Sequence, residues 1–113
     1  MKGQTLKENK DFRRLYYRGK NEASSALVTY GMKSRGDGVR YGITTSKKIG
    51  GAVERNRARR VIRAAFRNIE PQINGSWDFV FVARTRTTKC KEDVVERAML
   101  AHMKAMGAVD EED

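Results

Sequence analysis

The sequence is poor in cysteine, histidine and proline, and it lacks long apolar runs. Cys90 is the single cysteine among 113 residues, so neither an intrachain disulfide nor a cysteine-based metal cage can form. No window approaches the roughly 18 apolar residues of a membrane span, and residues 1–20 hold no uninterrupted apolar stretch of the secretory kind. Pro71 is the only proline, which excludes a proline-rich linker. We therefore expect one cytoplasmic domain over residues 1–113, with no membrane partner.

Side chains that could perform hydrolysis are also sparse. A protein nuclease needs clustered carboxylates for two metal ions, or a histidine pair for general acid–base chemistry. His102 is the only histidine, and its apolar neighbours on a predicted helix indicate a partly buried structural role. The candidate acids do not form a cluster in the sequence: residues that interrupt secondary structure, and arginines, separate Glu54, Glu70 and Asp78. We predict no catalytic residue and no metal site in the polypeptide.

Positive charge is abundant and unevenly placed. The formal net charge is +10, and because the four acids of residues 110–113 contribute −4, residues 1–109 carry +14. Residues 47–67 contain eight basic side chains and one acid, Glu54. A field this one-sided favours a polyanion as partner, although a merely soluble basic protein is the alternative that charge alone leaves open.

Apolar periodicity predicts three helices and three strands in the order α, β, β, α, β, α. We expect helices over residues 10–17, 52–69 and 91–106, and strands over residues 25–32, 39–45 and 77–83. Asn9 is the expected N-cap of the first helix, and the turn at residues 34–38 suggests that the first two strands form a hairpin. The last strand, WDFVFVA, is apolar on both faces apart from Asp78, as in a central strand. The pattern predicts an α/β (α+β) two-layer sandwich with about three helices packed on a small mixed sheet.

The segment VERNRARRVIRAAFR, Val53 to Arg67, contains six arginines. On a helical wheel the apolar sector holds Ala58, Val61, Ile62, Ala65 and Ile69, with Phe66 at its edge, and the opposite sector holds Asn56, Arg59, Arg60, Arg63 and Arg67. Like charges four residues apart repel by a few tenths of a kcal/mol per pair, a penalty that an RNA or DNA backbone removes. Arginine also binds phosphate through a planar fork.

Two other interpretations of this helix are a solvated charged face and a helix lying on an anionic membrane. The shortage of acids disfavours the first. The modest apolar stripe, with no aromatic residue on its polar side, disfavours the second. Ahead of the helix, residues 46–51 (SKKIGG) place two lysines, a hydroxyl and two glycines where a chain can approach phosphate closely.

Aromatic residues lie among cations near the N-terminus. Phe12, Tyr16 and Tyr30 are interleaved with Arg13 and other basic residues. This mixture suits single-stranded nucleic acid, because bases stack on the rings while cations follow the backbone. The alternative is that Phe12, Leu15 and Tyr16 are the buried face of the first helix, and helical spacing alone favours this second interpretation.

Residues 46–63, SKKIGGAVERNRARRVIR, resemble the signature of the bacterial ribonuclease P protein component. That family has an SKK-x-G stretch followed by A-V-x-R-N-R-x-K/R-R-x-I-R, and every fixed position is met. The opening LKENKDF, which begins at Leu6, and the Ala83-Arg84 pair after the last strand are also similar. The resemblance covers roughly residues 6–105.

The resemblance implies a protein subunit that assists an RNA catalyst. In this family the RNA subunit performs the Mg²⁺-dependent hydrolysis that frees the 5′ leader from precursor tRNA, while the protein binds the catalytic RNA and the leader. The implied partners are the catalytic RNA, at one protein per RNA, and precursor tRNA. The implied cofactor is Mg²⁺, bound mainly by the RNA. The implied fold is an α/β sandwich with a left-handed β-α-β crossover, against the general right-handed preference.

The resemblance also implies site residues, position by position. Those expected to contact the catalytic RNA are Lys47, Arg55, Asn56, Arg57, Arg59, Arg60 and Arg63. Those expected to line the cleft for the tRNA leader are Phe12, Arg13, Tyr16, Tyr30 and Lys48. The chain departs from the family at Tyr16, where phenylalanine is frequent, and at Gly51, where a longer side chain is common.

The two ends of the chain are expected to lie outside the core. Residues 1–5 should form a short arm, and residues 108–113 an acidic, disordered tail that is unlike the basic tails often seen in the family. Two other functions remain as alternatives: a non-catalytic RNA-binding module, such as a ribosomal protein, and a self-sufficient nuclease. The contiguous signature disfavours the first, and the lack of a carboxylate cluster disfavours the second.

Overall fold

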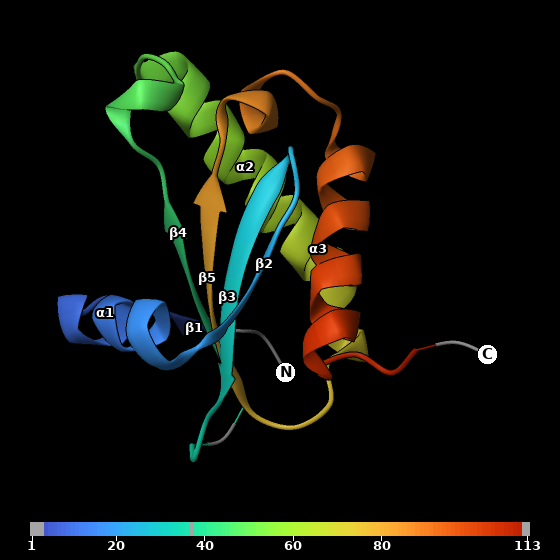
Figure 1. Cartoon of the computed structure of the whole chain (residues 1–113). Helices are drawn as coiled ribbons and strands as arrows, with labels where there is room; N and C mark the ends of the chain where they lie inside the picture. The colour runs from blue at the N-terminus through green and yellow to red at the C-terminus, as the bar shows by residue number, and fades with distance from the viewer. Residues whose placement is uncertain (1–3, 37, 112–113) are drawn as a thin grey trace.

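The computed structural model describes residues 4–36 and 38–111, which form one mixed sheet and three α-helices (Figure 1). The strand order is β1-β4-β5-β3-β2. The strands are β1 (Gln4–Thr5), β2 (Lys20–Ala23), β3 (Leu27–Lys33), β4 (Val39–Thr44) and β5 (Trp77–Ala83). The helices are α1 (Asn9–Arg18), α2 (Ala52–Ile69) and α3 (Glu92–Met106), with 3₁₀ turns η1 (Lys47–Ile49), η2 (Glu70–Gln72) and η3 (Thr85–Thr88). The predicted fold class, helices packed on a small mixed sheet, is confirmed.

Helices cover both faces of this sheet, and β5 shows how the sequence produces the arrangement. Its alternate residues point to opposite faces. Phe79 and Phe81 are fully buried in the main core with α2 and α3, while Val80 packs in a smaller cluster with Leu15 of α1. Figure 1 shows α1 on one side of the sheet and both α2 and α3 on the other.

The central position of β5 is confirmed, but the predicted hairpin is wrong. β5 pairs in parallel with β4 and antiparallel with β3, so it separates the two strands that were expected to pair. β3 forms its antiparallel hairpin with β2 instead. A strand that is apolar on both faces is best buried at the centre of a covered sheet. β5 therefore lies between β3 and β4, although the short turn between those two strands would favour their direct pairing.

Helix α2 has the predicted bounds, and it joins two neighbouring parallel strands. The chain leaves β4, crosses one face of the sheet through α2, and returns in β5. This is the β-α-β connection for which the resemblance predicts a left-handed path. Because α2 follows directly from the end of β4 and the turn η1, its N-terminal half borders the same end of the sheet as residues 43–45.

The N-terminal segment differs from the prediction in two respects. Glu8 is the N-cap of α1 and Asn9 is the first helical residue, so the predicted cap is wrong. The Glu8 carbonyl accepts the N–H groups of Asp11 and Phe12, and no side chain caps the helix. Gln4 and Thr5 of the expected arm form β1, which pairs in parallel with β4; residues 1–3 lie outside the described residues.

The acidic tail begins later than expected. Gly107, with φ of +90°, ends α3 in the left-handed conformation that glycine tolerates. The chain then turns back so that Ala108 and Val109 are buried, and Val109 bridges to Ile73. The prediction of disorder from residue 108 is therefore wrong for these two residues. Residues 112–113 of the predicted tail lie outside the described part of the chain.

Candidate nucleic-acid interface

Helix α2 separates an apolar side from a basic side, as the wheel predicted. Ala58, Ile62, Ala65, Phe66 and Ile69 are buried against the sheet and α3. Arg60, Arg63 and Arg67 are exposed on the opposite side together with Asn56. Because the apolar stripe fixes the helix on the sheet, the exposed arginines project from fixed backbone positions along one row of positive charge.

The arginines of α2 are not equivalent. Arg57 donates to the carbonyl oxygens of Thr88 at 2.8 Å, Cys90 at 3.2 Å and Thr87 at 3.5 Å, and thereby ties η3 and the following loop to α2. Arg59 contacts the Asn56 side chain at 3.4 Å, and Arg55 contacts the Gly50 carbonyl at the same distance. The guanidinium group of Arg57 is thus occupied by backbone carbonyls, a role that the sequence did not indicate.

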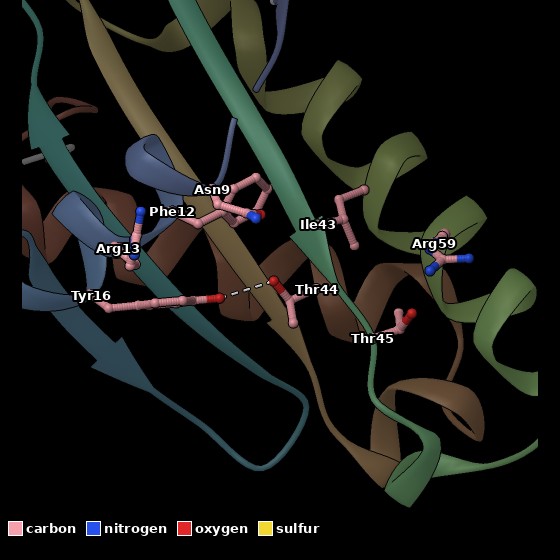
Figure 2. Close-up of a pocket in the computed structure, with 8 residues that line it drawn as sticks. All are labelled: Asn9, Phe12, Arg13, Tyr16, Ile43, Thr44, Thr45 and Arg59. Atoms are coloured by element: carbon pink, nitrogen blue, oxygen red, sulfur yellow. Dashed lines mark hydrogen bonds between the residues drawn. The ribbon is translucent and has the colours of Figure 1, made fainter. Parts of the chain in front are cut away.

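A cavity of about 550 Å³ lies between α1, the end of β4 and α2 (Figure 2), and we call it the α1–α2 cleft. Its lining residues are Asn9, Phe12, Arg13, Tyr16, Ile43, Thr44, Thr45 and Arg59. Three of the residues predicted for the tRNA leader therefore share one cavity with Arg59, which was predicted for the catalytic RNA. The two surfaces that the sequence suggested separately are continuous at this point.

The cleft aromatics are held by specific contacts and remain accessible. The Tyr16 hydroxyl lies 3.0 Å from Thr44 Oγ1, and the Tyr16 ring meets the Tyr30 ring edge to face with centroids 4.9 Å apart. Tyr16 is 40% exposed, whereas Leu15 on the same helix is fully buried. Leu15 therefore supplies the core contact of α1, and the Tyr16 ring keeps a face that a base can stack on.

The ring of Phe12 packs directly against Gly42. A Cβ atom at Gly42 would lie 2.7 Å from Cε1 of Phe12 and closer still to Cζ, so the ring rests directly on the β4 backbone. Phe12 is half-buried there and packs against the small cluster around Leu15 and Val80. The sequence placed Gly42 in a strand without indicating that the aromatic wall of a cleft depends on it.

The turn that precedes α2 presents its two lysines to solvent. Lys47 and Lys48 lie in η1 and are exposed. Gly50 has φ of +149°, and a Cβ atom there would lie 2.7 Å from that of Glu54, so the sharp entry into α2 requires glycine. Gly51 is the N-cap and offers no side-chain cap to the first helical N–H groups. Neither Lys48 nor Tyr30 is among the residues that line the cleft, although Tyr30 contacts its edge through Tyr16.

Two carboxylates on the α1 face of the sheet are neutralised by arginines. Asp78, 2% exposed, accepts two hydrogen bonds from Arg40 at 2.8 and 3.0 Å and one from Arg14 at 2.8 Å. Asp11 lies 3.3 Å from Arg14. The hydrogen bonds to Asp78 raise the pKa of the Arg40 guanidinium above its ordinary value. This network fixes α1 to β4 and β5, and it pairs Asp11 of α1 and Asp78 of β5, the two buried acids among the described residues.

Sequence reasoning missed several residues of the cleft. Asn9, Ile43, Thr44 and Thr45 line it, and the buried hydroxyl of Thr45 has no hydrogen-bond partner among the described residues. The position of Thr44 and Thr45 in the sequence could have indicated this role. Both directly precede the SKKIGG segment, where a strand ends and the chain leads into a helix. Polar groups at the end of a strand are well placed to reach a ligand.

His102 is buried against the sheet and contacts a threonine hydroxyl. His102 is 5% exposed, and its Nδ1 lies 2.8 Å from Thr29 Oγ1. Burial lowers the pKa of His102, an effect that the negative charge of Glu22 partly opposes. Within residues 4–36 and 38–111, no group of three or more histidine, cysteine or acidic side chains is arranged to hold a metal ion. In the same residues, no helix combines the length and the apolar character that crossing a membrane requires.

Fold and site together define a small basic α+β protein in which an arginine-rich helix borders a cleft of aromatic and basic side chains. The family model described as Ribonuclease P matches residues 1–107. The ribonuclease P protein component of Clostridioides difficile (strain 630) is 48% identical over 80 residues, 70% of each chain. That of Clostridium botulinum (strain Loch Maree / Type A3) is 35% identical over 108 residues, 95% of this chain and 97% of the relative.

A solved structure, the RNase P protein of Staphylococcus aureus, superposes with a TM-score of 0.83 at 29% identity, over 96% of this chain and 100% of that one. The chain therefore belongs to the ribonuclease P protein family of the bacterial type. Membership implies a part in an endoribonuclease holoenzyme that contains an RNA subunit and processes the 5′ end of tRNA.

Proposed function

We propose that this protein binds the catalytic RNA of ribonuclease P through α2 and η1, at one protein per RNA, and holds the 5′ leader of precursor tRNA in the α1–α2 cleft. The observation that supports this best is the position of Arg59, which belongs to the arginine-rich helix and also lines the cleft beside Phe12 and Tyr16. A leader that emerges from RNA bound on α2 would enter the cleft without leaving the protein surface. The cytoplasm, where precursor tRNA is made in bacteria, is the proposed place of action.

The cleft has the chemistry that a single strand requires. Bases stack on the exposed parts of Phe12 and Tyr16, each stacked base contributing about 1–3 kcal/mol. Arg13 and Arg59 line the same cavity and neutralise the strand's phosphates. Lys47 and Lys48, exposed on η1, extend the positive field toward the catalytic RNA.

The Mg²⁺ ions of the reaction are assigned to the RNA subunit. The two buried acids on the α1 face, Asp78 and Asp11, are already paired with Arg14 and Arg40, which makes them poor ligands for a cation. The protein's contribution is to bring positive charge beside RNA phosphates, which lowers the Mg²⁺ concentration that the RNA needs to fold and to bind substrate.

The decisive experiment mixes the protein with the cognate catalytic RNA and a precursor tRNA at low Mg²⁺. We expect the mixture to release the leader much faster than the RNA alone, and the advantage to shrink as Mg²⁺ is raised. The protein without RNA is the control. If it cut the precursor by itself, it would be a self-sufficient nuclease, and if the mixture were no faster than the RNA, the proposed function would be wrong.

A further inference from the structure

A second cavity, of about 540 Å³, lies on the same face of the sheet as the cleft and beside the other flank of α1; we call it the lower pocket. Its lining includes the side chains of Arg14, Arg18, Lys33, Arg35, Arg40 and Asp78. Arg14 and Arg18 come from α1, Lys33 ends β3, and Arg40 and Asp78 lie on β4 and β5. Five cations and one carboxylate thus converge on one hollow.

The positive charge of the lower pocket is only partly used by the fold. Arg14 and Arg40 neutralise the buried Asp78. Within residues 4–36 and 38–111, no carboxylate lies within 4.0 Å of Arg18 or Lys33, and both side chains are exposed. Arg18 and Lys33 also line an adjoining cavity of about 340 Å³ together with Lys20, so the cationic surface continues around the end of α1. The arrangement favours an anion that spans several cations.

The lower pocket and the α1–α2 cleft lie on opposite flanks of α1. Phe12, Arg13 and Tyr16 face the cleft, and Arg14 and Arg18 face the lower pocket. Between them Tyr17, 87% exposed, stands at the C-terminal end of the helix. Because an α-helix is only about 10 Å across, a strand that leaves the Tyr16–Tyr30 contact reaches the lower pocket by passing the exposed Tyr17 ring.

We propose that the lower pocket is a second phosphate-binding subsite, which holds the backbone of the single-stranded leader upstream of the nucleotides bound in the α1–α2 cleft. Planar guanidinium forks and an ammonium group suit phosphate oxygens, and Tyr17 offers a stacking surface between the two subsites. The inference rests on the function proposed above and deepens it by naming the path of the leader.

The test compares leader-length dependence between matched variants. Holoenzyme is reconstituted with wild-type protein or with Arg18→Gln/Lys33→Gln, and its affinity is measured for precursors with leaders of about 5 and about 12 nucleotides. Arg14 and Arg40 are left intact because they neutralise buried Asp78. The control, Arg97→Gln/Lys104→Gln, removes the same two charges from α3, which lies on the opposite face of the sheet.

Lengthening the leader should tighten binding to the wild type and to the control by about tenfold. The gain should fall to about twofold or less in Arg18→Gln/Lys33→Gln, while the short leader binds all three proteins alike. With the long leader, the dependence of log affinity on log salt should lose about 0.7 per phosphate contact removed. An unchanged gain with leader length would overturn the inference.

Equal losses for short and long leaders would also overturn the subsite, because they would assign the two cations to a general field or to the catalytic RNA. A failure of the proposed function itself looks different. In that case, wild-type protein would not accelerate cleavage of either precursor, and the variants would have no gain to lose.

Discussion

At the scale of single residues, Gly42 and Phe12 act as one unit. The Phe12 ring lies on the bare backbone of Gly42, and Phe12 lines the cleft. We expect Gly42→Ala to push the ring from its seat, with a loss of stability of about 1 kcal/mol from the overpacked contact. Phe12→Ala leaves the backbone intact and removes the ring.

Both variants should weaken binding of leader-bearing precursor tRNA more than binding of mature tRNA, because the same stacking surface is lost. Equilibrium titration of the reconstituted holoenzyme measures the two affinities. Tyr17→Ala, tested with a short leader that does not reach Tyr17, is the control and should bind like the wild type. Equal losses for precursor and mature tRNA would assign Phe12 to the core alone.

Arg57 belongs to the arginine signature, yet its guanidinium is bonded to the carbonyls of the η3 loop. Arg57→Lys keeps the charge but cannot fork between those carbonyls. We expect the free energy of unfolding to fall by about 1–2 kcal/mol, with an unchanged salt dependence of binding to the catalytic RNA. Arg60→Lys, an exposed neighbour on α2, should change stability by less than about 0.5 kcal/mol. Urea titrations measure the free energy of unfolding of both variants. If Arg57→Lys were as stable as the wild type and bound the catalytic RNA with a smaller salt dependence, Arg57 would contact the RNA rather than hold the η3 loop.

At the scale of elements, α2 presents its exposed arginines as a row. Arg60 is exposed and has no protein partner among the described residues within hydrogen-bond reach. Arg60→Ala should weaken binding to the catalytic RNA and reduce the slope of log affinity against log salt by about one unit. Arg97→Ala on α3 removes a charge of the same sign from a surface without a proposed RNA contact, and it should leave the slope unchanged. Identical slopes for Arg60→Ala and the wild type would show that Arg60 touches no phosphate.

The elements also differ in how well the sequence predicted them. α2 and β5 have their predicted bounds because each has a strong pattern, a 3.6-residue stripe or an apolar run, and glycine or proline lies close to at least one of its ends. β1 and β2 were missed because their residues are nearly all exposed and show no alternation. Strand order was beyond the local pattern, since β5 inserts between β3 and β4 through burial on both faces, which no spacing within one strand reveals.

The candidate site shows the same limit. The arginine pattern and the aromatic residues were predictable, because residue type and spacing indicate charge and stacking. The meeting of Phe12 and Arg59 in one cavity was not, because it depends on how α1 and α2 lie on opposite faces and reach around the end of β4. The hydrogen bonds from Arg57 to the carbonyls of residues 87, 88 and 90 could not be predicted from the sequence either, because they join segments 30 or more residues apart.

At the scale of the whole molecule, a buried polar pair joins the sheet to α3. Thr29 is fully buried on β3, and its hydroxyl meets Nδ1 of His102 on α3 at 2.8 Å. Burial lowers the pKa of His102, and Glu22 on β2 partly opposes this. The folded state therefore disfavours the imidazolium form, whereas the unfolded chain takes up a proton near the ordinary value of about 6.5.

The sign of the effect on stability follows from proton linkage. Below about pH 6.5 the unfolded chain binds more protons at His102 than the folded chain, so stability falls as pH falls from there toward the lower pKa of the folded state. Above about pH 6.5 the contribution of His102 is complete. Most carboxylates titrate at lower pH, which leaves a window between about pH 5 and 7.5 where this histidine dominates.

His102→Asn retains a polar group near Thr29 and cannot titrate. We expect it to lower stability at pH 7.5 and to remove most of the decline that the wild type shows between about pH 7.5 and 5. Urea unfolding at a series of pH values and constant ionic strength measures both effects. Parallel pH profiles for the two proteins would show that His102 is not the group that titrates. A flatter profile for His102→Asn would identify this single histidine as the pH-sensitive attachment of α3 to the sheet.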